Sequence, residues 1–202
     1  MKTISQLIIT MMICLFSIQA WAQSGKLFNT DNQLSSNLAT QVFQDKSGFI
    51  WIATRNGLNN YDGYHITVIK KDMSNFLGLN SNYINSIAQD EKEHILLGTN
   101  NSLLEFTGSE FLKIPMLDSK GKELATYVKQ VYPLKNKDVA VATSGYGIML
   151  KKQDEQKCHA MKGEVEKLKY IHKLLEDKRG RLWIITEDGK LYRKETNGRV
   201  TS

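Results

Sequence analysis

Acidic side chains recur at one place in a repeated pattern and are the first candidates for chemistry. Asp45, Asp90 and Asp177 each stand shortly before an apolar segment, next to a turn. Paired carboxylates can act as general acid and base, but such a mechanism needs two of them at a set separation. One aspartate per copy does not supply that pair, and Asp side chains commonly cap turns through hydrogen bonds to the backbone. We therefore predict structural aspartates and no catalytic residues.

The other reactive side chains form no recognisable catalytic or metal-binding pattern. Cys158 and His159 are adjacent in a polar connector over residues 151–166. Two neighbouring ligands fall short of the three or four that a zinc site needs, so the sequence predicts a solvated loop there and no metal site. The sequence has no nucleophile elbow and no phosphate-binding loop, which argues against hydrolase and nucleotide chemistry. We expect no cofactor.

Tryptophan, threonine and glycine also recur at equivalent places. Trp51 and Trp183 lie inside apolar runs, which favours packing between repeated units over stacking on a sugar. The threonines that end these runs are expected to hydrogen-bond the backbone at the strand end, and the glycines that follow belong to turns. These positions are Thr54, Thr99, Thr143 and Thr186, with Gly57 and Gly189.

The period of the pattern is close to 45 residues. Four equivalent positions, Trp51, Leu96, Ala140 and Trp183, are separated by 45, 44 and 43 residues. Each copy contains short apolar or β-branched runs divided by turns such as Asn-Gly and Asp-Gly, which is typical of antiparallel hairpins. Four strands in a unit of this length indicate a propeller blade, which buries its faces against neighbouring blades. The sequence thus predicts an all-β fold, a β-propeller of about four four-stranded antiparallel blades.

The chain divides into a leader and a repeat region. Residues 1–22 combine a basic start, an apolar run and a final Ala-Trp-Ala, which is typical of a cleaved signal peptide. The apolar run is too short to span a membrane, so we expect a soluble exported protein without a membrane span. The partial propeller then covers residues 23–202, with blades at about 34–78, 79–126, 127–169 and 170–202. The formal net charge of +6 comes from scattered basic residues, so nucleic acid is not an expected partner.

The first copy resembles the two-component regulator propeller repeat. Its matching residues are Asp45, Gly48, Ile50, Trp51, Ile52, Thr54, Gly57, Leu58, Tyr61 and Asp62. The resemblance extends over about residues 26–200, although Leu96 replaces the tryptophan of the second copy and Leu134 the aspartate of the third. It implies the periplasmic sensor region of a Bacteroides-type hybrid histidine kinase, which senses oligosaccharides derived from polysaccharides and works as a homodimer.

The resemblance also implies a larger ring than four blades can make. We therefore expect the chain to be an N-terminal fragment, an incomplete arc of a larger propeller. Kinase, receiver and DNA-binding motifs are missing from the sequence, so this chain is not expected to be an enzyme. The alternative is a standalone exported propeller that acts as a protein-interaction scaffold.

Ligand recognition is expected in the loops, because they vary while the strands repeat. Equivalent loops fall on one face of a propeller, where amide, guanidinium and phenol groups can bind a sugar. The alternative, turn chemistry alone, stays open for these residues. The candidates are Arg55, Asn56, Asn100, Asn101, Tyr146, Glu187 and Asp188.

Overall fold

The computed structural model describes residue 25, residues 27–71 and residues 78–202. The predicted signal peptide at residues 1–22 lies outside these described residues. Within them, no helix is long and apolar enough to cross a membrane.

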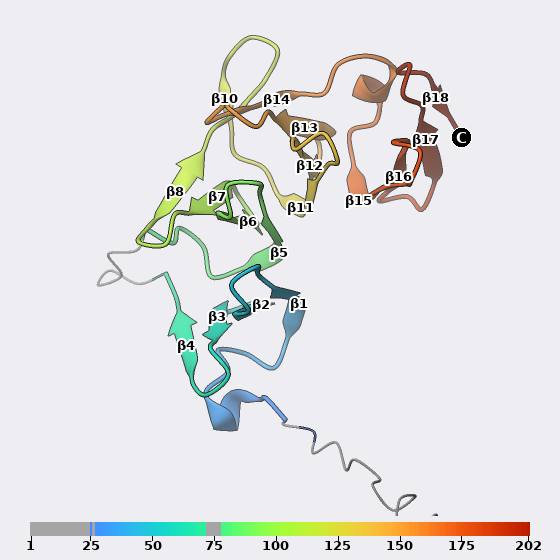
Figure 1. Cartoon of the computed structure of the whole chain (residues 1–202). Helices are drawn as coiled ribbons and strands as arrows, with labels where there is room; N and C mark the ends of the chain where they lie inside the picture. Colours follow the sequence, from blue (N-terminus) through green and yellow to red (C-terminus); the bar gives the residue numbers. More distant parts are fainter. Residues whose placement is uncertain (1–24, 26, 72–77) are drawn as a thin grey trace, which may run out of the picture.

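The structure is an arc of four successive β-sheets with two short 3-10 helices, η1 (Thr30–Asn32) and η2 (Glu164–Lys167) (Figure 1). The first sheet contains β1 (Ala39–Gln44), β2 (Ile50–Thr54), β3 (Gly57–Tyr61) and β4 (Ile66–Ile69). The second contains β5 (Ile84–Gln89), β6 (Ile95–Thr99), β7 (Leu103–Phe106) and β8 (Phe111–Ile114). The fourth contains β15 (Ile171–Glu176), β16 (Leu182–Thr186), β17 (Leu191–Lys194) and β18 (Val200–Thr201). These three sheets are the antiparallel four-stranded blades that the sequence predicts.

The third sheet has six strands, so the prediction of four is wrong for this blade. Its strands are β9 (Met116–Leu117), β10 (Glu123–Leu124), β11 (Val128–Pro133), β12 (Val139–Thr143), β13 (Ile148–Lys151) and β14 (Cys158–Ala160). The predicted solvated connector contributes β14, which pairs antiparallel with β13 and parallel with β9. Met116, Leu124 and Cys158 are all buried, and their burial explains why this segment joins the sheet.

One edge strand of every sheet carries a β-bulge at the same place. These four strands, β1, β5, β11 and β15, are called the first strands of their sheets. The register shifts between Ala39 and Gln41 in β1, and the other three first strands shift at the equivalent step. A bulge increases the local twist and redirects the side chains beside it. The strands β1, β5, β11 and β15 that carry these bulges line the concave side of the arc (Figure 1).

Neighbouring sheets pack through apolar side chains and through hydrogen bonds between their first strands. Between the first and second sheets, Trp51 and Ala53 join a core cluster with Ile84, Ile87 and Leu97. In addition, a polar side chain of β1, β5 and β11 forms a hydrogen bond with the backbone of the first strand in the following sheet. These bonds run from Ile87 N to Gln41 Oε1 (2.9 Å), from Gln41 Nε2 to Ile87 O (2.8 Å), from Val131 N to Ser86 Oγ (3.0 Å) and from Leu174 N to Gln130 Oε1 (2.7 Å).

At Gly98 in β6, side chains of the third sheet pack directly against the backbone of the second. A Cβ atom built there would lie 2.5 Å from Val128 Cγ1 and 3.3 Å from Val131 Cγ2. The pairing pattern gives the equivalent positions in the other sheets as Ala53, Ala142 and Ile185. In the described part of the chain the first and fourth sheets stand apart, so the arc is open (Figure 1).

Candidate functional site

A row of aromatic and charged side chains in mutual contact connects all four sheets. Arg55 follows β2, Tyr83 and Tyr127 precede β5 and β11, Lys129 lies in β11 and Glu187 follows β16. The Arg55 Cζ lies 5.5 Å from the centre of the Tyr83 ring, whose edge meets Tyr127 with ring centres 6.2 Å apart. The Lys129 Nζ is 4.5 Å from the centre of the Tyr127 ring and 3.3 Å from Glu187 Oε1. We call these five residues the aromatic row.

The aromatic row is held in place while parts of it remain open to solvent. Tyr83 and Tyr127 are half-buried, whereas Arg55 and Glu187 are exposed. The Tyr127 hydroxyl donates a hydrogen bond to Asn85 Oδ1 at 2.8 Å. Burial, with Tyr83 beside it, raises the pKa of Tyr127 to about 12, so the phenol stays neutral at physiological pH. Such a surface offers ring faces for stacking and both donors and acceptors for hydroxyl groups.

Only the two ends of this row are among the residues predicted from the sequence. Arg55 and Glu187 are among the candidate loop residues, but Tyr83, Tyr127 and Lys129 are not. The missed signal is the tyrosine immediately before the first strand, since Tyr170 stands there in the fourth sheet too. These side chains meet only because the bulged strands lie side by side.

Most of the other candidate loop residues make hydrogen bonds within their own turns. Asn101 Oδ1 accepts from Thr99 Oγ1 at 3.0 Å, and Asp188 Oδ1 accepts from Thr186 Oγ1 at 2.5 Å. The backbone of Asn56 donates to the threonine that ends β2, and Asn100 accepts from Ser81 Oγ. Exposed Tyr146 lies instead beside a separate pocket of about 140 Å³.

The four repeated threonines close the turns between the second and third strands. Each is buried, and its hydroxyl donates to a backbone carbonyl three or four residues ahead. The bonds run from Thr54 to Gly57 O (2.8 Å), Thr99 to Ser102 O (3.0 Å), Thr143 to Gly147 O (2.7 Å) and Thr186 to Lys190 O (3.1 Å). Gly57 (φ 129°) and Gly189 (φ 82°) occupy backbone conformations in these turns that other residues rarely adopt.

The repeated aspartates Asp45, Asp90 and Asp177 cap the turn between the first and second strands, and Asp45 and Asp177 also hold a tryptophan. Asp45 Oδ1 accepts from the backbone of Phe49, while its Oδ2 accepts from Trp51 Nε1 at 2.7 Å. Asp177 repeats this arrangement with Trp183 Nε1 at 3.0 Å. Burial alone would raise the pKa of Asp177, but the hydrogen bonds from Trp183 and Arg181 outweigh it and lower that pKa. Trp51, 6% exposed, packs between sheets, whereas Trp183 is half-buried.

Comparison with known proteins agrees with these repeated features. Three segments, residues 33–56, 78–101 and 167–188, match the family model described as two component regulator propeller. These three segments are thus similar to the repeat of that family, in agreement with the resemblance seen in the sequence. The search of curated proteins found no significant match.

Solved structures with the same fold include extracellular domains of bacterial signalling systems. The extracellular domain of the putative one component system BT4673 from B. thetaiotaomicron aligns with a TM-score of 0.72 and 17% identity, over 89% of this chain and 27% of that one. That of the putative hybrid two component system BT3049 from the same organism aligns with a TM-score of 0.54 and 15% identity, over 87% and 31%. The chain thus spans about a third or less of either domain.

Structures of proteins with other functions are also similar to this chain. A catalytically inactive virginiamycin B lyase from Staphylococcus aureus, solved with quinupristin, aligns with a TM-score of 0.63 and 11% identity, over 89% of this chain and 60% of that one. At such low identities these likenesses show the fold alone. The protein is a β-propeller segment similar to the extracellular domains of hybrid two component systems.

Proposed function

We propose that this chain is the N-terminal, periplasmic sensor portion of a hybrid two-component signalling protein and binds oligosaccharides released from polysaccharides. The aromatic row carries this proposal. It presents tyrosine rings, a guanidinium group and a carboxylate along one edge of four sheets, and each of these groups can bind a saccharide through stacking or hydrogen bonds.

A ligand on the aromatic row would touch more than one sheet. Arg55 and Tyr83 belong to the first and second sheets, and Tyr127 and Glu187 to the third and fourth. An oligosaccharide that spans the row would bind best to one spacing of the sheets and shift the arc toward it. Such a change could be transmitted to kinase and receiver parts in the complete receptor. In this proposal the chain itself catalyses nothing.

The test is saccharide binding by the full chain. We would screen an oligosaccharide panel and titrate the best ligand calorimetrically into the wild type, Tyr83→Ala and Arg55→Ala. A stacking tyrosine at the centre of a site contributes about 2 kcal/mol, so Tyr83→Ala should weaken binding about 30-fold. Tyr64→Ala is the matched control, because Tyr64 is 83% exposed in the turn after β3, far from the row.

Two results would contradict the sensor proposal. One is the absence of binding to any oligosaccharide, which favours the alternative of a protein-interaction scaffold. The other is a saccharide whose affinity is the same for Tyr83→Ala, Arg55→Ala and the wild type. Tyr146→Ala extends the test to the separate pocket beside β13.

Export and assembly can be tested on the same protein. Amino-terminal sequencing of the exported product should find Gln23 first if residues 1–22 are a cleaved signal peptide. Light scattering of the complete receptor should find twice the chain mass if it is a homodimer, as the resemblance implies.

A further inference from the structure

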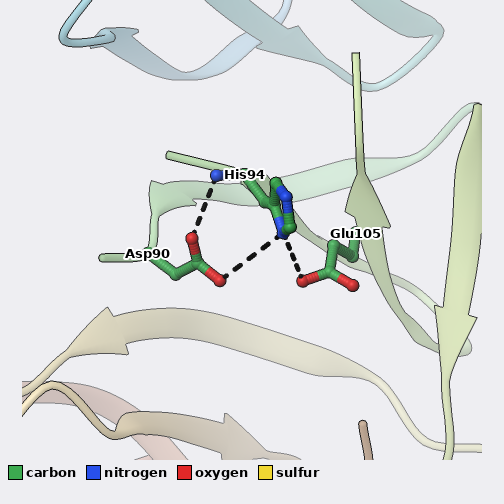
Figure 2. A group of neighbouring side chains, drawn as sticks. All are labelled: Asp90, His94 and Glu105. Carbon is green, nitrogen blue, oxygen red and sulfur yellow. Dashed lines mark hydrogen bonds and ion pairs between the residues drawn. The ribbon is translucent and has the colours of Figure 1, made fainter. Parts of the chain in front are cut away.

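Two buried carboxylates and an imidazole lie close together beside the turn that joins β5 and β6 in the second sheet (Figure 2). Asp90 follows the last residue of β5, His94 precedes β6 and Glu105 lies in β7. The side chains of Asp90 and Glu105 are only 6% and 3% exposed, and that of His94 is 31% exposed. The His94 Nδ1 lies 3.0 Å from Glu105 Oε1 and 4.0 Å from Asp90 Oδ2. We call these three residues the Asp90 cluster.

Comparison of the repeats shows what is missing around Asp90. In the first and fourth sheets the second oxygen of the equivalent aspartate accepts a hydrogen bond from an indole N–H. Leu96 occupies the tryptophan position in the second sheet, so Asp90 Oδ2 has no such donor. The residue paired with this position across the sheet is Asn60 in the first sheet and Arg193 in the fourth. In the second sheet it is Glu105, so a second carboxylate stands where the other sheets place a neutral or positive side chain.

Among the described residues, no lysine or arginine forms an ion pair with the Asp90 cluster. Among the described residues, Glu105 has no polar partner outside the cluster, and the only ion pair of Asp90 is with His94. Even a protonated imidazole leaves two negative charges facing one positive charge. Lys92 pairs instead with Asp154 on the neighbouring sheet.

One buried cation lies on the facing sheet. Lys151 is 2% exposed, and its pairing with Val139 and Cys158 in β13 puts it on the face that packs against the second sheet. Within the described part of the chain it makes no ion pair with either carboxylate. Buried carboxylates without a matching cation are costly, and a bound metal ion is one way in which proteins stabilise them.

We propose that the Asp90 cluster binds a divalent transition-metal ion of the zinc type through His94 Nδ1, Asp90 Oδ2 and Glu105 Oε1. The three atoms lie within 4.8 Å of one another. Tetrahedral zinc with bonds of about 2.1 Å places its ligands about 3.4 Å apart, so the observed 3.0 and 4.0 Å need only small side-chain movements. One nitrogen and two oxygen ligands suit zinc better than calcium or magnesium, which prefer oxygen alone.

The surroundings give the ion a structural role. Of the three cluster residues, only His94 is partly open to solvent, and it also lines a cavity of about 680 Å³ between the first and second sheets. Asp90 Oδ1 accepts from the backbones of Lys92 and His94, so the turn is already formed around it. A bound ion would connect the turn between β5 and β6 to β7. In the first and fourth sheets the equivalent turn is instead connected to the second strand by the hydrogen bond from the tryptophan indole to the aspartate.

The experiment is a calorimetric titration of zinc chloride into the full chain after removal of metals with EDTA. We expect one site per chain in the wild type. His94→Phe and Glu105→Gln should weaken it by more than the roughly 10- to 100-fold that loss of an outer-shell partner costs. His94→Phe imitates Phe49 at the equivalent place in the first sheet, and Glu105→Gln keeps the side-chain size. His159→Phe is the control, because it removes an exposed imidazole paired with Glu155 outside the cluster.

Each outcome decides the proposal. Zinc binding that survives His159→Phe but is lost in the two cluster variants supports it. Two results overturn it. One is the absence of zinc binding by the wild type, which is expected if Lys151 balances the charge of the two carboxylates. The other is zinc binding that remains unchanged in His94→Phe and Glu105→Gln. If the variants fail to fold, X-ray absorption at the zinc edge of the wild type decides instead. One imidazole with oxygen ligands supports the proposal, and a sulfur ligand from cysteine overturns it.

Discussion

Replacing Gly98 by alanine should weaken the junction between the second and third sheets. The new Cβ would lie 2.5 Å from Val128 Cγ1, closer than carbon atoms approach in folded proteins. Val128 is fully buried and its β-branched side chain is stiff, so it has little room to turn away. Gly98 has no positive φ, so the expected effect comes from contact and not from backbone strain.

The magnitude follows from two opposing contributions. Inserting a carbon into a well-packed core costs about 1–3 kcal/mol. Alanine also restricts the unfolded chain, which stabilises the folded protein by about 0.4–1 kcal/mol. We therefore expect Gly98→Ala to lower the free energy of unfolding by about 1–2 kcal/mol.

The assay is urea unfolding followed by tryptophan fluorescence, arranged as a double-mutant cycle with Val128→Ala. Removing the two methyl groups of Val128 relieves the 2.5 Å contact, so Gly98→Ala should cost clearly less in that background, where Val128 Cβ at 3.2 Å and Val131 Cγ2 at 3.3 Å remain as close neighbours. The coupling free energy between the two positions should be about 1 kcal/mol. Gly25→Ala is the control, because no atom lies within 4 Å of its Cβ.

Either of two results would refute this reasoning. One is a Gly98→Ala protein at least as stable as the wild type. The other is a cost for Gly98→Ala that is the same in the wild-type and Val128→Ala backgrounds, since the contact would then not be its cause.

Three further predictions concern single side chains. Burial raises the pKa of the Cys158 thiol from 9.0 to about 12, so the unfolded state loses this proton first and the free energy of unfolding should fall as pH rises from 9 toward 12. Urea unfolding of Cys158→Ala should lack that component, and an unchanged slope would count against it. Trp51→Phe removes the N–H bonded to Asp45 and should cost about 1.5–3 kcal/mol in the same assay, unlike the exposed control Tyr64→Phe. Thr143→Val removes the bond to Gly147 O and should cost about 1 kcal/mol, whereas Thr67→Val on the exposed face of β4 should cost little.

The sequence predicts the second strand of each sheet closely. The four equivalent positions in the apolar runs, Trp51, Leu96, Ala140 and Trp183, all lie at the second residue of these strands, β2, β6, β12 and β16. These strands are easy to find because each is buried and lies between turn residues, so local composition and tertiary packing favour the same structure. The four antiparallel strands of the first, second and fourth sheets are predicted correctly for the same reason.

Features that depend on partners distant in the sequence are not predictable from local patterns. The strands β9 and β14 are two and three residues long, and Met116 and Cys158 pair only because the chain returns to the same edge. No local pattern marks such short segments. The aromatic row is missed for a related reason, since its members come from four sheets and only the stacking of bulged strands brings Tyr83 next to Tyr127.

The Asp90 cluster shows a different limit. Asp90 looks like the other repeated aspartates, and its repeat position predicts a turn cap, which its backbone hydrogen bonds form. What distinguishes it is the exchange of two residues across the sheet, Leu96 and Glu105, which lie nine positions apart in the sequence. Only strand pairing shows that they face the same aspartate.

The hydrogen bonds between the first strands have a direction along the chain. In each of these bonds the side chain belongs to the earlier blade and the backbone to the later one, as with Gln41 and Ile87. During synthesis the earlier blade therefore emerges with its side chain ready to bind, and the strand it holds is made about 45 residues later. We expect the arc to assemble by successive docking of each new blade onto the one before it, so that the growing end is always the less protected one.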